Sequence, residues 1–436
     1  MRPVQPSLSR HSQSVPAWLQ ELVSDKSDGP KLYAWTSDNL EGVWQRSVEN
    51  AMTRRPSRSE PNPGRRVHIL GVGNLGRLYA SSLASLAEAP VTLVLHRKSL
   101  LEQWISDPAI EITRRGLTER ASAFDAEWWT EEKPLVGPIR EACDGTKIRN
   151  LIVGTKAPDA LPQVDRLRRY LDGSSTVAFV QNGMNRLWPP NGAMYNSKRF
   201  PPQQHPSWIV CVTTHGVTSL GAFKSAHASP ADVAMGPVLL NPKTQSESEF
   251  LMDQILRAPH LAARKVATCA LWVLQLEKLV VNSTINPMTA LLRCKNGLLF
   301  SRPGGNSERV MDLLVAEASL VLQALVQDNS SREILADAES FSSTQSALLA
   351  RFSFSQLRAM LRHVGEKVKD NTSSMLQDVT SGKQTEIREF NGWFVEMAEY
   401  LGVEAPNHKM ICELVEKGLI LEEDKLGRYF PAVNKV

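Results

Sequence analysis

The hexapeptide Gly-Val-Gly-Asn-Leu-Gly at residues 71–76 lies between an apolar run typical of a strand and an apolar pattern typical of a helix. The strand-like run covers residues 67–70, and a second one at residues 91–95 follows at the distance that a βαβ unit requires. The glycines of such a unit allow a tight turn, a close approach to a pyrophosphate, and close packing of helix on strand. The sequence therefore predicts a dinucleotide site formed by Gly71, Gly73, Asn74, Leu75 and Gly76.

The residues after the second strand-like run indicate which dinucleotide binds. An NAD site usually has an acidic residue here, which accepts hydrogen bonds from the ribose 2′-hydroxyl. This chain has His96, Arg97 and Lys98 instead, and a guanidinium can hold a 2′-phosphate in a forked, charge-assisted contact. We therefore predict NADPH as the cofactor, with Arg97 as its main contact. A solvated basic turn is the alternative interpretation.

The composition excludes several classes of protein. The 436 residues suffice for two domains, and the net charge of +4 gives no reason to expect a nucleic-acid partner. No apolar run reaches the roughly 18–20 residues of a membrane span. The five cysteines are scattered without a CxxC pair, which argues for reduced thiols and against a disulfide scaffold or a metal site. We expect an intracellular protein, cytoplasmic or in the mitochondrial matrix, that is a monomer or a homodimer.

Residues 1–66 form an N-terminal extension that is rich in Ser, Pro, Arg and Asn and ends in a linker-like stretch. Its first twenty residues contain Arg2 and Arg10 but no acidic residue, which loosely fits a mitochondrial transit peptide. Trp18, Trp35 and Trp44 indicate that part of the extension docks on the rest of the protein. We therefore expect the extension to be partly disordered and partly docked.

Residues 67–245 alternate strand-like runs with segments that are compatible with helices or loops, as expected of a Rossmann-type α/β domain. Lys156 follows the run at 151–154, and Asn182 follows the run at 176–180. Ligands of open α/β sheets bind beyond the carboxyl ends of the strands. Both residues are therefore predicted contacts of cofactor or substrate. A surface lysine and an Asn-Gly turn are the alternatives.

The rest of this domain carries weaker patterns. The Pro- and Asn-rich stretch 187–207 is predicted to be a surface loop, and further strand-like runs follow at 208–213 and 233–236. Lone histidines are more often structural than catalytic, so we assign no chemistry to His215 or His227.

Helical periodicity replaces the strand pattern over residues 246–436, which predicts an all-α second domain. The expected helices cover residues 251–261, 266–281, 307–326, 344–362, 390–401 and 411–419.

Lys278, Asn282 and Asn286 recur every four residues in an apolar run, so a helix would align them along one face. Asparagine is a poor residue for a helix interior, and an aligned set indicates a buried polar stripe that faces a cleft. Pro287 disfavours helical geometry at the residue before it, so we expect a kink or the end of the helix there. A capped, solvated helix end is the alternative.

A second polar constellation follows nearer the carboxyl terminus, in residues 371–378 and 385–392. Its hydroxyl groups are suited to holding a carboxylate, and its acidic groups are suited to orienting a hydroxyl or an ammonium. Taken alone, this stretch is more typical of a helix cap followed by a solvated helix.

Several motifs, in order, give the chain a resemblance to the 2-dehydropantoate 2-reductase (ketopantoate reductase) family over roughly residues 66–418. The resemblance implies a Rossmann-type domain followed by an all-α domain, as in 6-phosphogluconate dehydrogenase-like proteins. It also implies NADPH-dependent reduction of 2-dehydropantoate to (R)-pantoate in the biosynthesis of pantothenate and coenzyme A. The motifs are GVGNLG, TKAPD, QNG, TTHG, KLVVNSTINPMTAL, CKNGLL, NTSSMLQDV and TEIREFNG.

The resemblance implies roles for the residues of this chain that match the family's motifs. Lys278 resembles the catalytic general acid, and Glu386 resembles the acid that grips the substrate hydroxyl and orients the lysine. Four residues, Asn282, Asn286, Ser374 and Asn371, match positions at the substrate. Lys156 and Asn182 match positions near the nicotinamide end of the cofactor, and no metal is implied.

Three departures from the compact bacterial type keep other functions open: the N-terminal extension, the insertion near 189–204 and the long segment 306–349. One alternative is a reductase of another branched 2-keto acid, since the Lys and Asn stripe would serve any 2-keto acid. Another is a non-enzymatic NADPH-binding protein with a mitochondrial regulatory role. The presence of both Lys278 and Glu386 favours catalysis.

Overall fold

The glycine-rich hexapeptide joins the first parallel strand of the central sheet to the helix that follows it. The computed structural model describes residues 15–41, 63–243, 245–336 and 341–435. In it β2 (Val67–Leu70) leads into α3 (Asn74–Ala84) and on to β3 (Val91–Leu95), which pairs parallel with β2. The predicted βαβ unit is therefore present. The predictions on Arg2, Arg10, Trp44 and most of the linker lie outside the described residues.

Nine strands of the described part of the chain form one sheet, in the order β1-β6-β3-β2-β7-β8-β9-β12-β13. The strands from β6 to β9 are all parallel and have the order of a doubly wound dinucleotide-binding sheet. β1 and β12 pair antiparallel on either side of them. The remaining strands are β1 (Tyr33–Trp35), β6 (Asp125–Thr130), β7 (Asn150–Val153), β8 (Thr176–Phe179), β9 (Ser207–Thr213), β12 (Val233–Leu239) and β13 (Ala263–Lys265).

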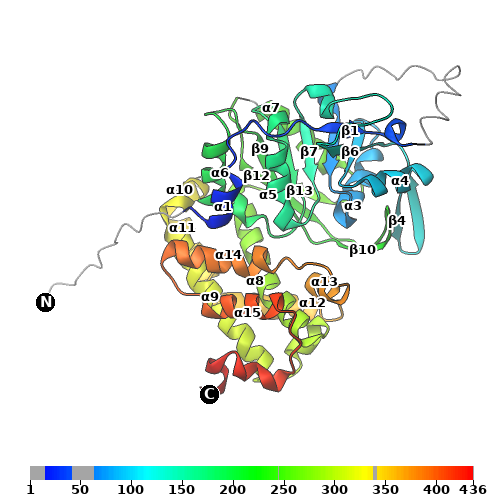
Figure 1. Ribbon diagram of the computed structural model, residues 1–436. Helices are drawn as coiled ribbons and strands as arrows, with labels where there is room; N and C mark the ends of the chain where they lie inside the picture. Colours follow the sequence, from blue (N-terminus) through cyan, green and yellow to red (C-terminus); the bar gives the residue numbers. More distant parts are fainter. Residues whose placement is uncertain (1–14, 42–62, 244, 337–340, 436) are drawn as a thin grey trace.

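Helices cover both faces of this sheet (Figure 1). Successive side chains of a strand point to opposite faces, so Ile69 and Leu70 belong to two different hydrophobic clusters. The cluster of Ile69 includes α3 and α7, and the cluster of Leu70 includes α5 and α6. The bounds of these helices are α5 (Ala157–Arg166), α6 (Asn191–Arg199) and α7 (Gln245–Arg257). A further helix, α4 (Lys98–Ser106), follows β3.

A second sheet, which the sequence analysis did not predict, contacts α3. Its order is β10-β11-β4-β5, and it joins two hairpins that lie about a hundred residues apart in the chain. The strands are β4 (Ile110–Arg114), β5 (Leu117–Ala121), β10 (Gly216–Gly221) and β11 (Lys224–Ser229).

The stretch 187–207 is not the surface loop that its proline and asparagine content predicts. It contains α6, and Trp188, Tyr195 and Phe200 are buried. Tyr195 and Phe200 pack edge to face or tilted against Trp208 of β9. The aromatic side chains determine the structure of this stretch, because burying them contributes a large favourable free energy of folding. This gain outweighs the preference of the polar residues around them for solvent.

The second part of the chain is helical and begins at α8, because α7 packs on the sheet and β13 belongs to it. The predicted boundary near residue 246 therefore precedes the structural one. By length and composition α9 could cross a membrane, but most of it is buried as a core helix against α8, α12 and α14. The helices are α8 (Thr268–Leu292), α9 (Asn306–Gln327), α10 (Arg332–Ala336), α11 (Phe341–Arg351), α12 (Phe354–Lys367), α13 (Ser374–Thr380), α14 (Ile387–Leu401) and α15 (Pro406–Glu416).

Two predicted helix boundaries are wrong. The helix expected over 344–362 is two helices, α11 and α12, because buried Phe352 ends one and Ser353 precedes the next. The helix end that Pro287 could have caused is not there, since α8 continues to Leu292. Proline cannot donate to the carbonyl four residues earlier, and here the amide of Asn391 on α14 donates to that Ser283 carbonyl at 2.8 Å.

Part of the N-terminal extension docks on the rest of the protein. β1 extends the central sheet by pairing with β6, and Trp35 is buried. The helix α1 (Ala17–Leu22) inserts Leu19 into the larger hydrophobic cluster. Figure 1 shows α1 next to α14, at the junction of the sheet and the helical part.

Candidate active site

The loop between β2 and α3 has the backbone geometry of a pyrophosphate site. Gly71 has a φ of +90°, which residues with side chains rarely adopt. A Cβ at Gly76 would lie 2.1 Å from the Gly71 carbonyl oxygen, so only glycine lets the helix pack this closely. Gly73 precedes α3 without a side-chain cap, which leaves the first N–H groups of the helix without intrahelical partners. These features fit a bound dinucleotide.

The first residues of α3 fix the loop in place. Asn74 and Leu75, both predicted cofactor contacts, begin the helix, so their backbone N–H groups point toward the anion position. The side chain of Asn74 accepts a hydrogen bond from Ser225 of β11 at 3.1 Å. The small second sheet therefore anchors the dinucleotide loop.

Arg97 lies at the carboxyl end of β3, where a ribose 2′-phosphate is expected. His96, Arg97 and Lys98 are exposed, and the Lys98 ammonium lies 5.5 Å from the centroid of the Trp35 ring. Among the described residues Arg97 forms no ion pair, so its guanidinium is accessible to an incoming phosphate.

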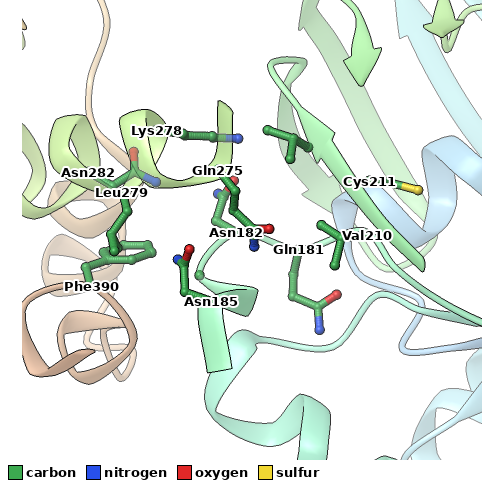
Figure 2. Close-up of a pocket in the computed structure, with 12 residues that line it drawn as sticks. Gln181, Asn182, Asn185, Val210, Cys211, Gln275, Lys278, Leu279, Asn282 and Phe390 are labelled. Carbon is green, nitrogen blue, oxygen red and sulfur yellow. The ribbon is translucent and has the colours of Figure 1, made fainter. Parts of the chain in front are cut away.

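Lys278 and Asn282 lie on one face of α8 and line a pocket between the helix and the end of the sheet, as the stripe predicts. Asn182, from the loop after β8, lines the same pocket. Figure 2 shows Lys278 extending from α8 toward β9, with Asn282 one turn further along the helix. The other lining residues are Gln181, Gly183, Asn185, Val210, Cys211, Val212, Gln275, Leu279 and Phe390.

The pocket is too small for a substrate in this conformation, since its volume of about 10 Å³ holds no more than one water molecule. Contacts outside the pocket lining also hold the two parts of the chain together. Lys156, at the end of β7, forms an ion pair with Asp378 of α13 at 2.8 Å and donates to the Gln384 carbonyl at 2.9 Å. We therefore expect the two parts to separate when ligands enter.

The electrostatic setting of Lys278 suits proton transfer. Burial lowers the pKa of Lys278 to about 8, although the negative charges of Glu386 and Asp232 act in the opposite direction. The ammonium donates a hydrogen bond to the Thr213 carbonyl at the end of β9. A lysine with this pKa exchanges a proton readily near neutral pH.

Glu386 lies immediately before α14. Burial raises its pKa, and a hydrogen bond from the Ala157 N–H at 3.0 Å acts against that shift. Because Glu386 and Lys278 influence each other's pKa, the structure brings the two predicted catalytic residues into one electrostatic unit.

Of the four predicted substrate contacts, Asn282 lines the pocket and the other three do not. The Asn286 amide donates to the Ser374 hydroxyl at 3.5 Å, so this pair lies together where α8 meets α13. Ser374 and Asn371 are exposed, and the Asn371 backbone carbonyl accepts a hydrogen bond from the Asn296 N–H at 3.2 Å. The roles of Asn286, Ser374 and Asn371 at the substrate stay predictions.

The predicted site residues did not include three polar residues of the pocket, Gln181, Asn185 and Gln275. Gln275 precedes Lys278 by one turn and accepts a hydrogen bond from Trp188 at 2.7 Å. Asn185 is buried, and its side-chain oxygen has no partner among the described residues. The helical stripe that identified Lys278 extends back to Gln275 and could have included it. Asn185 lies before the predicted loop 187–207, and no pattern in the sequence marked it.

His215 and His227 contact one another, with 3.0 Å between His215 Nδ1 and His227 Nε2. The Ala231 N–H donates to His215 Nδ1, and Arg114 donates to His227 Nδ1. Both rings are therefore neutral, which agrees with the lowered pKa values that burial gives them. The described residues contain no cluster of three metal-ligating side chains.

A dinucleotide loop at the carboxyl end of a doubly wound sheet, in a chain that also brings a buried lysine of α8 and an acid before α14 together, is typical of a nicotinamide-dependent oxidoreductase. The comparison with family models agrees. Residues 67–239 match the model of ketopantoate reductase PanE/ApbA, and residues 271–418 match the model of its C-terminal domain. The chain therefore belongs to the ketopantoate reductase family.

Individual relatives differ in how much of the chain they match. A ketoisovalerate reductase of Beauveria bassiana is 37% identical over 96% of this chain and 99% of its own length. A probable 2-dehydropantoate 2-reductase of Schizosaccharomyces pombe is 29% identical over 81% of this chain and 96% of its own. The crystal structure of a probable 2-dehydropantoate 2-reductase from Bacillus subtilis covers 81% of this chain and 99% of its own, with a TM-score of 0.53 and 21% identity. That structure supports the fold.

Proposed function

We propose that this protein reduces a branched 2-keto acid, 2-ketoisovalerate, to the 2-hydroxy acid with NADPH. The observation that carries this proposal is the extent of similarity to the ketoisovalerate reductase, which covers nearly the whole of both chains. The 2-dehydropantoate 2-reductase matches less of this chain at lower identity. The alternative substrate class of the sequence analysis is thus favoured over 2-dehydropantoate, its main prediction.

The residues of the pocket have distinct roles in this reaction. NADPH, which residues 71–76 and Arg97 would hold, would supply the hydride for the keto carbon. Lys278 holds a proton at Nζ and gives it to the keto oxygen as negative charge develops there. Asn282, Asn286 and Ser374 hold the substrate carboxylate, and Glu386 keeps the ammonium oriented. Closure of the two parts excludes water from the reacting atoms.

One side of the pocket lining suits an isopropyl group, because Leu279, Val212 and Phe390 supply apolar surface there. The opposite side is polar, with amide side chains at Asn185 and Gln275. A hydroxyl of 2-dehydropantoate that met the apolar side would lack a partner, which opposes binding by on the order of 100-fold.

NADPH oxidation by the purified protein, followed by absorbance with each keto acid, tests the proposal. We expect kcat/KM for 2-ketoisovalerate to exceed that for 2-dehydropantoate by about tenfold or more. A higher kcat/KM for 2-dehydropantoate would instead assign the protein to the synthesis of pantoate. If the protein bound NADPH but oxidised it with neither acid, the non-enzymatic alternative would replace both.

The pKa of Lys278 gives the reaction a defined pH dependence. Reduction requires the protonated ammonium, so we expect kcat/KM for reduction to be level below pH 8. Above that it should fall about tenfold per pH unit. Oxidation of the 2-hydroxy acid requires the neutral amine and should rise over the same range. Parallel pH profiles in the two directions would contradict the assignment of Lys278 as the proton donor.

The cofactor assignment rests on Arg97. In the variant Arg97→Ala we expect the Kd for NADPH to rise about 30-fold, because a charge-assisted contact to the 2′-phosphate contributes about 2 kcal/mol. The Kd for NADH, which has no such phosphate, should stay within about twofold. Fluorescence titrations with both cofactors measure the two values. Equal losses would mean that Arg97 is a solvated residue.

A further inference from the structure

The N-terminal extension contacts a buried ion network behind the active-site pocket. Trp18 of α1 stacks on the guanidinium of Arg186, with 4.7 Å from Cζ to the ring centroid. The indole N–H of Trp18 also donates to a carboxylate oxygen of Glu396 at 3.1 Å. One side chain of α1 therefore touches both members of an ion pair that joins the two parts of the chain.

Arg186 holds the loop after β8 on α14. Its guanidinium donates to Glu389 at 2.5 Å and to Glu396 at 2.6 Å, two residues on one face of that helix. The side chains of Arg186 and Glu389 are only 14% and 4% exposed. Breaking a buried ion pair of this kind is costly, since removing one partner leaves the other charge uncompensated.

The loop and the helix that Arg186 joins both supply residues to the pocket. Asn182 and Asn185 come from the loop, and Phe390 follows Glu389 on α14 (Figure 2). Gly183, with a φ of +77°, approaches so closely that a Cβ there would lie 3.0 Å from the Glu389 side chain. A shift of Arg186 would therefore change the shape of the pocket.

Other contacts hold α1 on the sheet side of this junction. Leu19 is fully buried, and Arg199 of α6 donates to the backbone carbonyl of Leu22 at the end of α1. Arg168, after α5, forms an ion pair with Asp25. Because Arg199 lies on α6, Arg168 follows α5 and Glu396 lies on α14, α1 spans the junction between the two parts.

We propose that Arg186 is a positioning residue for the reduction and that Trp18 braces it, which makes the N-terminal extension part of the catalytic apparatus. Trp18 keeps the guanidinium on Glu389 and Glu396, and this holds Asn182 and Asn185 against α14. The inference rests on the proposed reductase function. The brace acts on the loop after β8, which lines the pocket, whereas the dinucleotide loop follows β2 and Arg97 follows β3.

The variants Trp18→Ala and Trp18→Phe test this brace. For Trp18→Ala we expect kcat to fall about tenfold, since a partly desolvated cation–π contact and a hydrogen bond to a charged group are both lost. Trp18→Phe keeps a ring face for Arg186 and should lose about threefold or less. The Kd for NADPH should stay within about twofold in both. Gln20→Ala, on the exposed side of α1, is the matched control and should leave all values unchanged.

Two measurements separate positioning from a loss of stability. Leu101→Ala removes a buried side chain of α4 away from α1, and should lower Tm while leaving kcat per folded molecule unchanged. Hydrogen exchange of the peptide covering 181–187 should speed up in Trp18→Ala and stay unchanged in Gln20→Ala and Leu101→Ala.

The outcomes distinguish this inference from the proposed function. Wild-type kcat together with wild-type exchange in Trp18→Ala would overturn the brace. The brace would also be overturned if the fall in kcat were fully explained by the fraction of unfolded protein that the lower Tm implies. If the unaltered protein reduced neither keto acid, the proposed function would fail, and the exchange of residues 181–187 would still decide whether Trp18 holds the loop.

Discussion

Replacing Lys278 by alanine should lower kcat about 1,000-fold while leaving the Kd for NADPH within about twofold. The lysine both donates the proton and stabilises the charge that develops on the keto oxygen, and such groups contribute about 100- to 10,000-fold. Its side chain lies at the pocket between α8 and β9, away from the dinucleotide loop. Steady-state kinetics and a fluorescence titration with NADPH measure the two quantities on the same preparation.

Lys278→Arg is the informative companion to this variant. Arginine keeps the positive charge but does not release its proton near neutral pH. We therefore expect Lys278→Arg to bind the keto acid better than Lys278→Ala and to remain about 100-fold or more below the unaltered protein in kcat. Turnover of Lys278→Ala within tenfold of the unaltered protein would remove the lysine from the proposed chemistry.

The parts of the fold that local sequence determines could be predicted. A strand, three spaced glycines and a helix form a βαβ unit through contacts between close neighbours in the chain, so the hexapeptide at 71–76 identified the unit and its ligand end together. The stripe of Lys278 and Asn282 was readable for the same reason, since residues four apart share a helix face.

The parts of the fold that depend on partners far away in the sequence could not be predicted. Pro287 is compatible with a continuous α8 only because Asn391, more than a hundred residues later, satisfies the carbonyl that proline leaves without a donor. The helix α6 forms in a polar stretch where Tyr195 and, directly after the helix, Phe200 pack on Trp208. Neither partner is indicated by the local pattern, so the kink or end was expected from Pro287 and the loop from the proline and asparagine content of 187–207.

The same distinction applies to the site. Sequence reasoning could name Glu386 only through family resemblance, because its bond to the Ala157 N–H and its influence on Lys278 join segments far apart in the chain. The network of Trp18, Arg186 and Glu389 likewise has no local signature. Ser374 and Asn371 of one motif both lie exposed outside the pocket lining, so their roles at the substrate stay predictions that rest on the resemblance.

Replacing Gly76 and Gly73 of the hexapeptide by alanine should have two different effects on stability and NADPH affinity. In Gly76→Ala the new Cβ would lie 2.1 Å from the backbone carbonyl of Gly71, which has no flexible side chain to move aside. We expect α3 to shift, the free energy of unfolding to fall by about 3 kcal/mol, and the Kd for NADPH to rise more than about 100-fold.

Gly73→Ala is the matched control, because the nearest atom to its Cβ would be the Gly154 carbonyl oxygen at 3.7 Å, an ordinary contact. This variant should keep its Tm within about 2 °C and still lose NADPH affinity, since the Cβ stands where the backbone must approach the pyrophosphate. Thermal unfolding and NADPH titration of both variants separate the two roles. Normal NADPH affinity in Gly73→Ala would show that the cofactor does not approach this loop, and would require another site for the dinucleotide despite the geometry of Gly71 and α3.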